Sequence, residues 1–394
     1  MSSDRAAPLS FRRARLVAGG AVPLAWYNLV AKKPRLIRAS AGIGFAVLLM
    51  VMQLGFEAAF FNSSFQIIRA LDADLVIASV HKYSFVTQQP FAPDLVDKAG
   101  AVPGVASASP LYAHWFDTYW KNPSDGKVLL VRAFAFDPDR PVFRFPEVRA
   151  QAHELKAADG VLVDRRARPF LGMDPPPPSS EINGRRMRVV GSFALGPDFQ
   201  SDGTVMMSAQ TMRQLFPETG VEAGIIKLAP GADRNSVIKR LRAALPPDIA
   251  VLTKAQLLDL ERKFQATLSS AGPIFAMGTI VGFVVGMLIS YQVIYADLSE
   301  QLPQYATLKA MGYRRFYLIR TVLEQAALSA LAGWLPAFVL SLGLYRLIAE
   351  LALIPLAMSA GIALVSLFLT LGMCLVSAAL AVRRVLATDP AEVF

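Results

Sequence analysis

The sequence is short of charge and nearly devoid of cysteine. Charged residues make up 18% of its 394 residues, against roughly a quarter in soluble domains, while 54% are hydrophobic and the mean hydropathy is +0.41. This balance indicates a membrane protein. The single cysteine, Cys374, excludes an intrachain disulfide.

The motifs of common enzyme classes are missing as well. The sequence contains no G-x-x-x-x-G-K-[ST] loop to cradle phosphates and no G-x-S-x-G nucleophile motif. His81, His114 and His153 lie far apart, without the spacing of metal ligands. The two acids Asp72 and Asp74 fit a solvated strand end better than a catalytic pair. We therefore expect a chain that is not an enzyme and has no cofactor or metal of its own.

Long hydrophobic runs are what the sequence has instead. A bilayer crossing takes about 20 apolar residues, and only Glu57 and Glu324 interrupt the runs with a charge. The first run begins after nearly 40 residues and is too long for a signal peptide, so we expect an uncleaved anchor. The four runs cover residues 39–61, 264–296, 321–345 and 351–382.

Positive charge gathers beside these runs. Eight basic residues and one acid precede the first run and supply seven of the net ten positive charges. Basic flanks remain on the cytoplasmic side, so we expect both termini and the 297–320 loop to be cytoplasmic and the large domain to face the other side of the membrane. Charge beside a span indicates a membrane surface rather than nucleic acid.

The segment 21–38 combines aromatic and basic residues in front of the first run. Such a mixture is typical of a helix in the headgroup region; the alternative is a plain basic flank without a helix. The predicted membrane-interface residues are Trp26, Tyr27, Lys32, Lys33, Arg35 and Arg38.

Together these features predict an α-helical membrane protein with four transmembrane helices and a large α+β periplasmic domain between helices 1 and 2. The expected segments are a basic disordered leader (1–20), the interfacial segment (21–38), helix 1 (39–61), the periplasmic domain (62–270), helix 2 (271–296), a cytoplasmic coupling loop or helix (297–320), helix 3 (321–345), a short periplasmic hairpin (346–352), helix 4 (353–382) and a cytoplasmic tail (383–394).

Alternating and helical patterns subdivide the periplasmic domain. The first helix continues to about residue 71, and the helix 255–270 is expected to run straight into the second span. The unit 224–256 reads as β-α-β. Predicted strands cover 72–79, 105–120, 127–136, 185–195, 224–230 and 249–256, with helices at 92–100, 207–216 and 233–245 and a proline-rich loop at 173–182.

The cytoplasmic loop contains a short stretch with residues typical of a helix start and a helix end, LPQYATLKAMGY. Pro303 suits the first position of a helix and Gly312 the residue just past its end. Two isolated turns are marginal in water, so we expect docking on a partner to hold them; the alternative is a structured turn without a partner. The predicted partner-coupling residues are Leu302, Pro303, Tyr305, Leu308, Lys309, Met311 and Gly312.

Four stretches make the chain resemble the MacB/FtsX superfamily of ABC-type permeases, and within it the DevC-type exporter permeases. They are PLAWYNL (23–29), AGIGFAVLLMVMQLGF (41–56), LPQYATLKAMGY (302–313) and the tail DPAEVF (389–394). The resemblance implies a non-catalytic permease subunit that forms a homodimer, with ATP bound by a separate ABC ATPase on the cytoplasmic loop. It further implies a bacterial inner membrane with the large domain in the periplasm, a periplasmic adaptor protein and an outer-membrane channel.

The resemblance thus predicts the permease of a tripartite efflux system that exports a lipid-like, glycolipid or amphiphilic substrate. One alternative is an FtsX-like signalling permease that activates a periplasmic cell-wall hydrolase. A secondary transporter is a weaker alternative, because spans two and four carry no ionisable residue.

Overall fold

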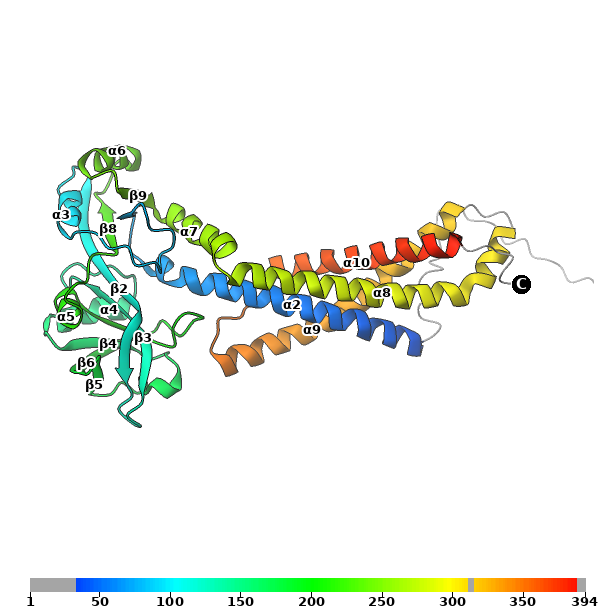
Figure 1. Cartoon of the computed structure of the whole chain (residues 1–394), viewed down its shortest axis with the longest axis horizontal. Coiled ribbons are helices and arrows are strands. Elements are labelled where there is room, and N and C mark those ends of the chain that lie inside the picture. Colours follow the sequence, from blue (N-terminus) through cyan, green and yellow to red (C-terminus); the bar gives the residue numbers. More distant parts are fainter. Residues whose placement is uncertain (1–32, 311–314, 388–394) are drawn as a thin grey trace, which may run out of the picture. The chain divides into compact units, whose positions relative to one another are not determined.

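Four long helices form the membrane part of the protein (Figure 1). A computed structural model describes residues 33–310 and 315–387, with the side chains of 37–300, 316 and 319–384. By length and composition, the four helices can span a membrane over Ile37–Ala70, Ala271–Glu300, Ile319–Ala352 and Ala360–Arg384. The helices are α2 (Lys33–Ala70), α8 (Ala271–Ala310), α9 (Arg315–Ala352) and α10 (Ala360–Ala387). This arrangement confirms the expected four spans with a domain between the first and second.

Some helix boundaries differ from the expected ones. Helix α8 runs unbroken through Pro303 to Ala310, so the short helix expected to begin at Pro303 is the end of a longer one. Helix α9 continues to Ala352, and the connection to α10 is the non-helical segment 353–359 rather than 346–352. The leader 1–20 and the tail motif 389–394 lie outside the described residues.

The expected unbroken helix from residue 255 into the second span is wrong. Helix α7 (Lys254–Lys263) passes into the π-helical turn η3 (Phe264–Leu268), and the backbone is extended at Ser269 (ψ 141°) before α8 begins. The Ser269 hydroxyl accepts a hydrogen bond from the backbone N–H of Ala271 at 3.2 Å, as a helix-starting serine does. The sequence SSAGP therefore ends one helix and begins another.

The outer domain is built on one nine-stranded sheet that closes partly on itself. Its strand order is β3-β7-β4-β6-β5-β2-β8-β1-β9, and β3 also pairs with β2. Six strands thus form a closed ring, from which β8, β1 and β9 extend as an open sheet. The strands are β1 (Leu75–Ser79), β2 (Val105–Lys121), β3 (Val128–Phe136), β4 (Gly160–Asp164), β5 (Ser179–Ile182), β6 (Arg185–Phe193), β7 (Thr204–Ser208), β8 (Ala223–Leu228) and β9 (Ile249–Thr253).

The 17-residue strand β2 joins the ring to the open sheet. Its first half pairs with β8 and its second half with β3 and β5. In the open sheet β1 lies between β8 and β9, antiparallel to both, so the expected β-α-β unit exists with a third strand inserted. The short helices are α3 (Asp94–Gly100), α4 (Pro146–Gln151), α5 (Ala209–Leu215) and α6 (Arg234–Ala244), with 3₁₀ turns η1 (Ala152–Lys156) and η2 (Pro169–Leu171).

Both faces of the sheet are buried over its central strands. Alternate residues of a strand point to opposite faces, and the mostly apolar β1 contributes Leu75 and Ile77 to one hydrophobic cluster and Val76 to the other. Strand β3 divides in the same way: Ala133 and Ala135 face one cluster, while the phenylalanines between and after them face the other. A continuous apolar strand is what a sheet covered on both sides requires.

Candidate coupling site

Helix α2 is continuous from its membrane span into the core of the outer domain. Ile67 and Ile68, in its last turn, are 1% and 0% exposed and belong to a hydrophobic cluster of that domain. Burying two such side chains contributes roughly 1.5–3 kcal/mol each. The end of the helix is therefore a structural part of the domain and not a tether to it.

A lysine from α7 caps the end of α2. The ammonium of Lys254 donates to the backbone carbonyls of Arg69 and Leu71, at 2.7 Å each. The last carbonyls of a helix lack intrahelical donors, so this contact joins the end of α2 to the start of α7. Partial burial, together with the nearby Arg144, lowers the pKa of Lys254 to about 8.

Asp72, just past this end, is held by cations rather than solvated as expected. Its carboxylate contacts the Lys227 ammonium at 2.5 Å, the Arg144 guanidinium at 3.3 Å and Arg149. Partial burial raises the pKa of Asp72, but the Lys227 hydrogen bond and the surrounding positive charges outweigh it and lower the pKa overall. Asp74 accepts a hydrogen bond from the backbone N–H of Leu228 at 2.9 Å.

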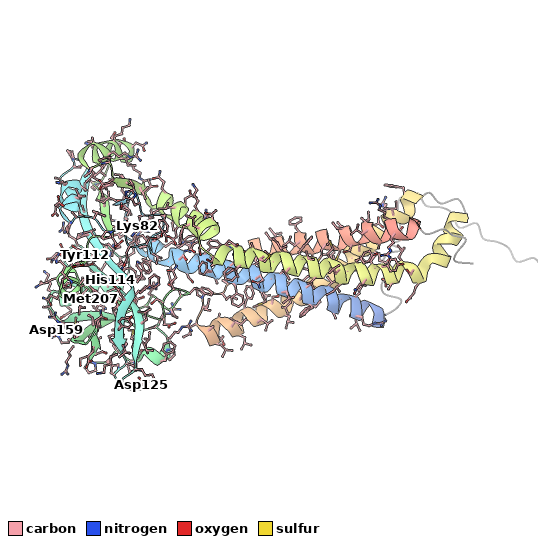
Figure 2. All side chains as sticks on the ribbon, in the orientation of Figure 1. Lys82, Tyr112, His114, Asp125, Asp159 and Met207 are labelled. Atoms are coloured by element: carbon pink, nitrogen blue, oxygen red, sulfur yellow. The ribbon has the colours of Figure 1, made fainter. Side chains whose placement is uncertain are left out.

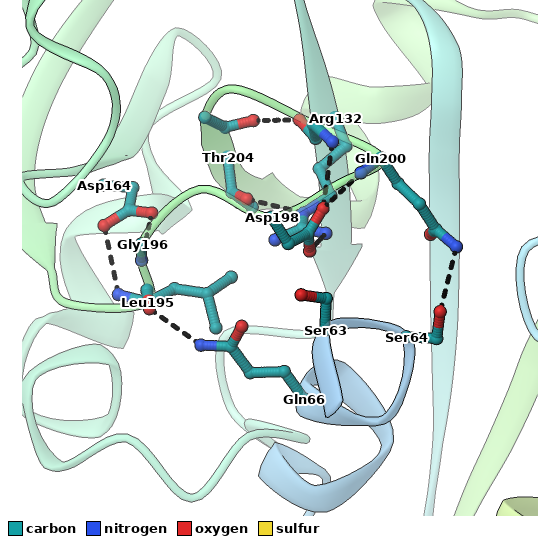
Figure 3. Close-up of polar contacts among 12 residues, drawn as sticks. Ser63, Ser64, Gln66, Arg132, Asp164, Leu195, Gly196, Asp198, Gln200 and Thr204 are labelled. Atoms are coloured by element: carbon teal, nitrogen blue, oxygen red, sulfur yellow. Dashed lines mark hydrogen bonds and ion pairs between the residues drawn. The ribbon is translucent and has the colours of Figure 1, made fainter. Parts of the chain in front are cut away.

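The loop between β6 and β7 (194–203) contacts the side of α2 through two glutamines (Figure 3). Gln66 of α2 donates to the carbonyl of Leu195 at 2.8 Å, and Gln200 of the loop donates to the Ser64 hydroxyl at 3.3 Å. The same loop meets α2 with an aromatic pair, Phe60 and Phe199, whose ring centroids are 5.6 Å apart. We call this contact the α2 junction.

A buried ion pair fixes the loop to the ring of strands. The guanidinium of Arg132 on β3 donates to the Asp198 carboxylate at 2.5 Å and to the Thr204 hydroxyl at 2.7 Å. Both charged side chains are only 1% exposed. Asp198 also accepts from the backbone N–H groups of Gln200 and Ser201, at 2.8 and 2.9 Å.

A second carboxylate holds the beginning of the loop. Asp164, the last residue of β4, accepts from the backbone N–H groups of Leu195 at 3.0 Å and Gly196 at 2.8 Å (Figure 3). Burial raises the pKa of Asp164, while these hydrogen bonds oppose the shift. The loop is thus anchored to the sheet through Asp164 and Arg132 and contacts α2 through Leu195, Phe199 and Gln200, so short polar contacts link α2 to the strands.

Helix α7 is held to the segment that follows β1 by one buried carboxylate. Glu261, 0% exposed, accepts from the Ser84 hydroxyl at 2.9 Å and the Phe85 backbone N–H at 2.7 Å. In the same segment Lys82 (Figure 2) pairs with Glu222 at 2.5 Å. Burial lowers the pKa of Lys82, against the charge of Glu222. These contacts stop just before the interruption between α7 and α8.

Within residues 283–337 and 367–384, helix α8 packs against α9 and α10. Gln325 of α9 donates a hydrogen bond to the Asp297 carboxylate of α8 at 3.4 Å, next to apolar contacts between the same helices. The apolar cluster consists of Ile294 and Leu298 of α8, Val322 and Ala326 of α9, and Ala378, Ala381 and Val382 of α10. The segment expected to couple to a partner continues the same helix, α8, beyond this cluster.

The predicted coupling and interface residues lie at the margins of the described chain. Those on the described backbone of α8 are Leu302, Pro303, Tyr305, Leu308 and Lys309, whereas Met311 and Gly312 lie outside the described residues. Trp26, Tyr27 and Lys32 also lie outside; Lys33 and Arg35 begin α2, and Arg38 is exposed. Their roles remain predictions.

Sequence patterns missed the residues of the α2 junction and of the ion pair that fixes its loop to the strands. The sequence did contain a signal for the ion pair, because Arg132 is the only charge in the otherwise apolar stretch VLLVRAFAF. A single charge in a strand that is buried on both faces needs a buried partner. Which residue is that partner could not be foreseen, since Asp198 is 66 residues away in a loop. Among the described residues, no group of three or more His, Cys, Asp or Glu side chains is placed to hold a metal ion.

Comparison with known proteins places this architecture in a family. The model of the MacB-like periplasmic core domain matches residues 39–244, more than half of the chain. The model of the FtsX-like permease C-terminal domain matches residues 267–390. The two matches cover the first span with the outer domain, and the last three spans.

Individual relatives are more distant. The macrolide export ATP-binding/permease protein MacB of Bdellovibrio bacteriovorus is 23% identical over 235 residues, which are 56% of this chain and 36% of that protein. The chain therefore spans about a third of that relative's length.

Two solved structures are similar in part. One is the periplasmic region of MacB from Actinobacillus actinomycetemcomitans (TM-score 0.35, 11% identity, 51% of this chain and 96% of that one). The other is the extracellular domain of the noncanonic ABC-type transporter YknZ from Gram-positive bacteria (TM-score 0.33, 9% identity, 46% and 99%). With one family model matching more than half of its length and a second matching its last three spans, the chain belongs to the MacB/FtsX superfamily of ABC-type permeases.

Proposed function

We propose that this chain is the membrane subunit of an ABC-type export system, in which it transmits movement from a cytoplasmic ATPase to the periplasmic domain. The observation that carries the proposal is the continuity of α2. One helix of 38 residues includes a membrane span, and its end is buried in the outer domain and bonded to the β6–β7 loop. A continuous helix keeps its backbone hydrogen bonds along its length, so in this proposal it passes a displacement of the span on to the outer domain.

The cytoplasmic partner in this proposal is a separate ABC ATPase, which binds ATP and docks on the end of α8. The superfamily supports such a partner, as well as a homodimer of the permease. The sequence contains no phosphate-binding loop, and this supports the proposal that a separate ATPase supplies the energy. Both termini and the 297–320 segment are then cytoplasmic, as the basic flanks predict.

The finer assignment is a DevC-type tripartite exporter, completed by a periplasmic adaptor protein and an outer-membrane channel, with an amphiphilic or glycolipid-like cargo. It rests on the sequence resemblance. An FtsX-like signalling permease would use the same α2 junction to activate a hydrolase. Copurification with this chain distinguishes the export function from the signalling function. An ATPase together with an adaptor supports export, and an ATPase together with a cell-wall hydrolase supports signalling.

Interrupting α2 ahead of the two glutamine contacts of the junction, at Ser64 and Gln66, tests the mechanical proposal. Asn62 is exposed on α2, so Asn62→Pro removes one helix hydrogen bond and adds a ring clash at a cost of about 3 kcal/mol, while few side-chain contacts are lost. We expect the complex with its ATPase to hydrolyse ATP but to lose export.

The matched control is Asn62→Ala, which keeps the helix and removes only the contact of its amide with Arg69. It should export normally. Unimpaired export by Asn62→Pro, with the protein at its normal level in the membrane, would refute the role of α2.

A further inference from the structure

A pocket of about 260 Å³ lies where the outer domain meets the connection between α9 and α10. The contact is direct: Arg168 donates to the carbonyl of Ala352, the last residue of α9, at 2.8 Å. Ile354 of the connection lines the pocket together with residues of the outer domain. The lining comprises Leu130, Arg168, Asp198, Phe199, Gln200, Ser201, Asp202 and Ile354.

One wall of this pocket is apolar and continues along the outer domain. Leu130 of β3 is 40% exposed, and its partner across the strand pair, Tyr119 of β2, is 49% exposed. Val128, two residues before Leu130 and therefore on the same face, is 61% exposed. Large apolar side chains that are exposed together mark a binding surface rather than ordinary domain surface. Here the surface begins at the end of two membrane spans.

The polar wall offers acceptors, and Arg168, the one cation among the described residues that line the pocket, is already paired. The Arg168 guanidinium is bound to the Asp202 carboxylate at 2.6 Å, and the buried Arg132 behind the pocket is bound to Asp198 at 2.5 Å. Two carboxylates are thus balanced by two guanidinium groups. A phosphate or carboxylate head would find no unpaired positive charge, whereas the Asp202 side chain is 45% exposed and can accept further hydrogen bonds.

We propose that this pocket binds the head group of an amphiphile that donates hydrogen bonds and carries no negative charge, with its alkyl chain against Leu130 and Phe199. A pocket of this size holds a head group rather than a whole lipid, and the exposed apolar strip accommodates the chain. An ammonium head binds most tightly, because it pairs with the exposed carboxylate of Asp202. The inference rests on the proposed export function, for which it supplies the place where cargo leaves the membrane.

Binding is tested on the full chain in lipid nanodiscs without an ATPase. The probes are photoreactive dodecylamine and photoreactive dodecyl phosphate, with the labelled residues mapped by mass spectrometry. We expect the amine probe to label the pocket, and the phosphate probe to label it at least tenfold less. Asp202→Asn should weaken amine labelling by about tenfold, the effect of one hydrogen bond to a charged group.

Two further variants test whether labelling depends on the charge of the pocket and on the pocket itself. Leu130→Lys adds a cation to the apolar wall and should turn the preference toward the phosphate probe. Val80→Ser changes an apolar residue that is 49% exposed and does not line the pocket, so labelling should be unchanged.

Equal labelling by both probes, or equal loss in Val80→Ser and Asp202→Asn, would overturn the proposal. Failure of the export function itself would be seen separately, as pocket labelling by the amine probe without ATP-dependent release of an amine amphiphile in the complete system.

Discussion

The ion pair between Arg132 and Asp198 should be a main determinant of outer-domain stability, and the single change Asp198→Asn tests this. Asparagine keeps the side-chain oxygen that accepts from the N–H groups of Gln200 and Ser201, so the change removes mainly the charge. It leaves a guanidinium that is 1% exposed without its counter-ion. Breaking a buried pair in this way costs about 3–5 kcal/mol, a large part of the 5–15 kcal/mol that typically stabilises a domain.

A double-mutant cycle separates the pair from its two members. Arg132→Met alone leaves the Asp198 carboxylate buried and should cost a similar amount, whereas the double variant removes both charges of the pair. We expect the double variant to be destabilised by clearly less than the sum of the two single changes, because the penalty of each single change is an uncompensated charge. The control is Glu181→Gln, which breaks a pair with Lys121 whose members are each 41% exposed and should cost about 0–1 kcal/mol.

The assay is urea unfolding of the full chain in detergent, followed by tryptophan fluorescence. The ring of Trp115 lies 5.8 Å from the Arg132 guanidinium carbon, so it reports on this site directly. Replacing Trp26 and Trp334 by phenylalanine confines the signal to the outer domain, where the other two tryptophans lie. A loss below about 1 kcal/mol for Asp198→Asn would show that the loop is held by its other contacts and would refute the reasoning.

Three further outcomes are expected elsewhere in the chain. Since the pKa of Lys254 is about 8 in the folded protein and near 10.4 in an unfolded chain, the unfolded state binds more protons between these values. The unfolding free energy of the wild type should therefore rise relative to Lys254→Gln from about pH 8 to pH 10, and a constant difference across this range would contradict the assignment. An added Cβ on Gly55 would lie 2.0 Å from the buried hydroxyl of Tyr345, so Gly55→Ala should lower stability by about 1–3 kcal/mol in thermal unfolding, and Tyr345→Phe should recover part of the loss. Truncating Tyr305 or Leu308 should weaken a pull-down of the ATPase about thirtyfold, the effect of losing one buried anchor, and unchanged coupling in both variants would leave this segment without a docking role.

The membrane part of the fold was predictable because its signal is one-dimensional. Four nearly uncharged runs need no partner elsewhere in the sequence to be recognised, and each contains a helix long enough to span a membrane. The long strands β2 and β3 were also foreseen, since both are long and flank the turn NPSDG. Length and periodicity are local properties, and local properties can be read from sequence.

Short central strands were missed for the opposite reason. Strands β4 and β7 have five residues each, every one of them buried, so they show no alternation. Stretches such as GVLVD and TVMMS are too short to distinguish a strand from a buried turn of helix. What makes them strands is pairing with partners far along the chain, for instance β7 with β3.

Helix boundaries were predicted wrongly where a proline or a serine fits both the interior and the end of a helix. Pro303 was read as a helix start, yet α8 passes through it; the two serines at 269 and 270 were read as helix interior, yet they separate η3 from α8. A proline fits several positions in a helix, and packing decides which one is used. The α2 junction could not be predicted because its partners are 66 to 136 residues apart.

The two connections between the membrane and the outer domain differ in a way that bears on mechanism. Helix α2 reaches the domain as one unbroken helix, and its end is fixed by buried isoleucines, by Lys254 and by the β6–β7 loop. The return path through α7 is interrupted between residues 264 and 270, first by a π-helical turn and then by an extended residue. In the proposed mechanism, a displacement along α2 would act on the sheet directly, because no break in the helix lies between the two. A displacement along α8 would first meet the interruption, where the backbone is no longer held by a regular helical ladder. Lys254 joins the end of α2 to the beginning of α7, so both connections are fixed to the domain at the same place and differ only in their continuity toward the spans.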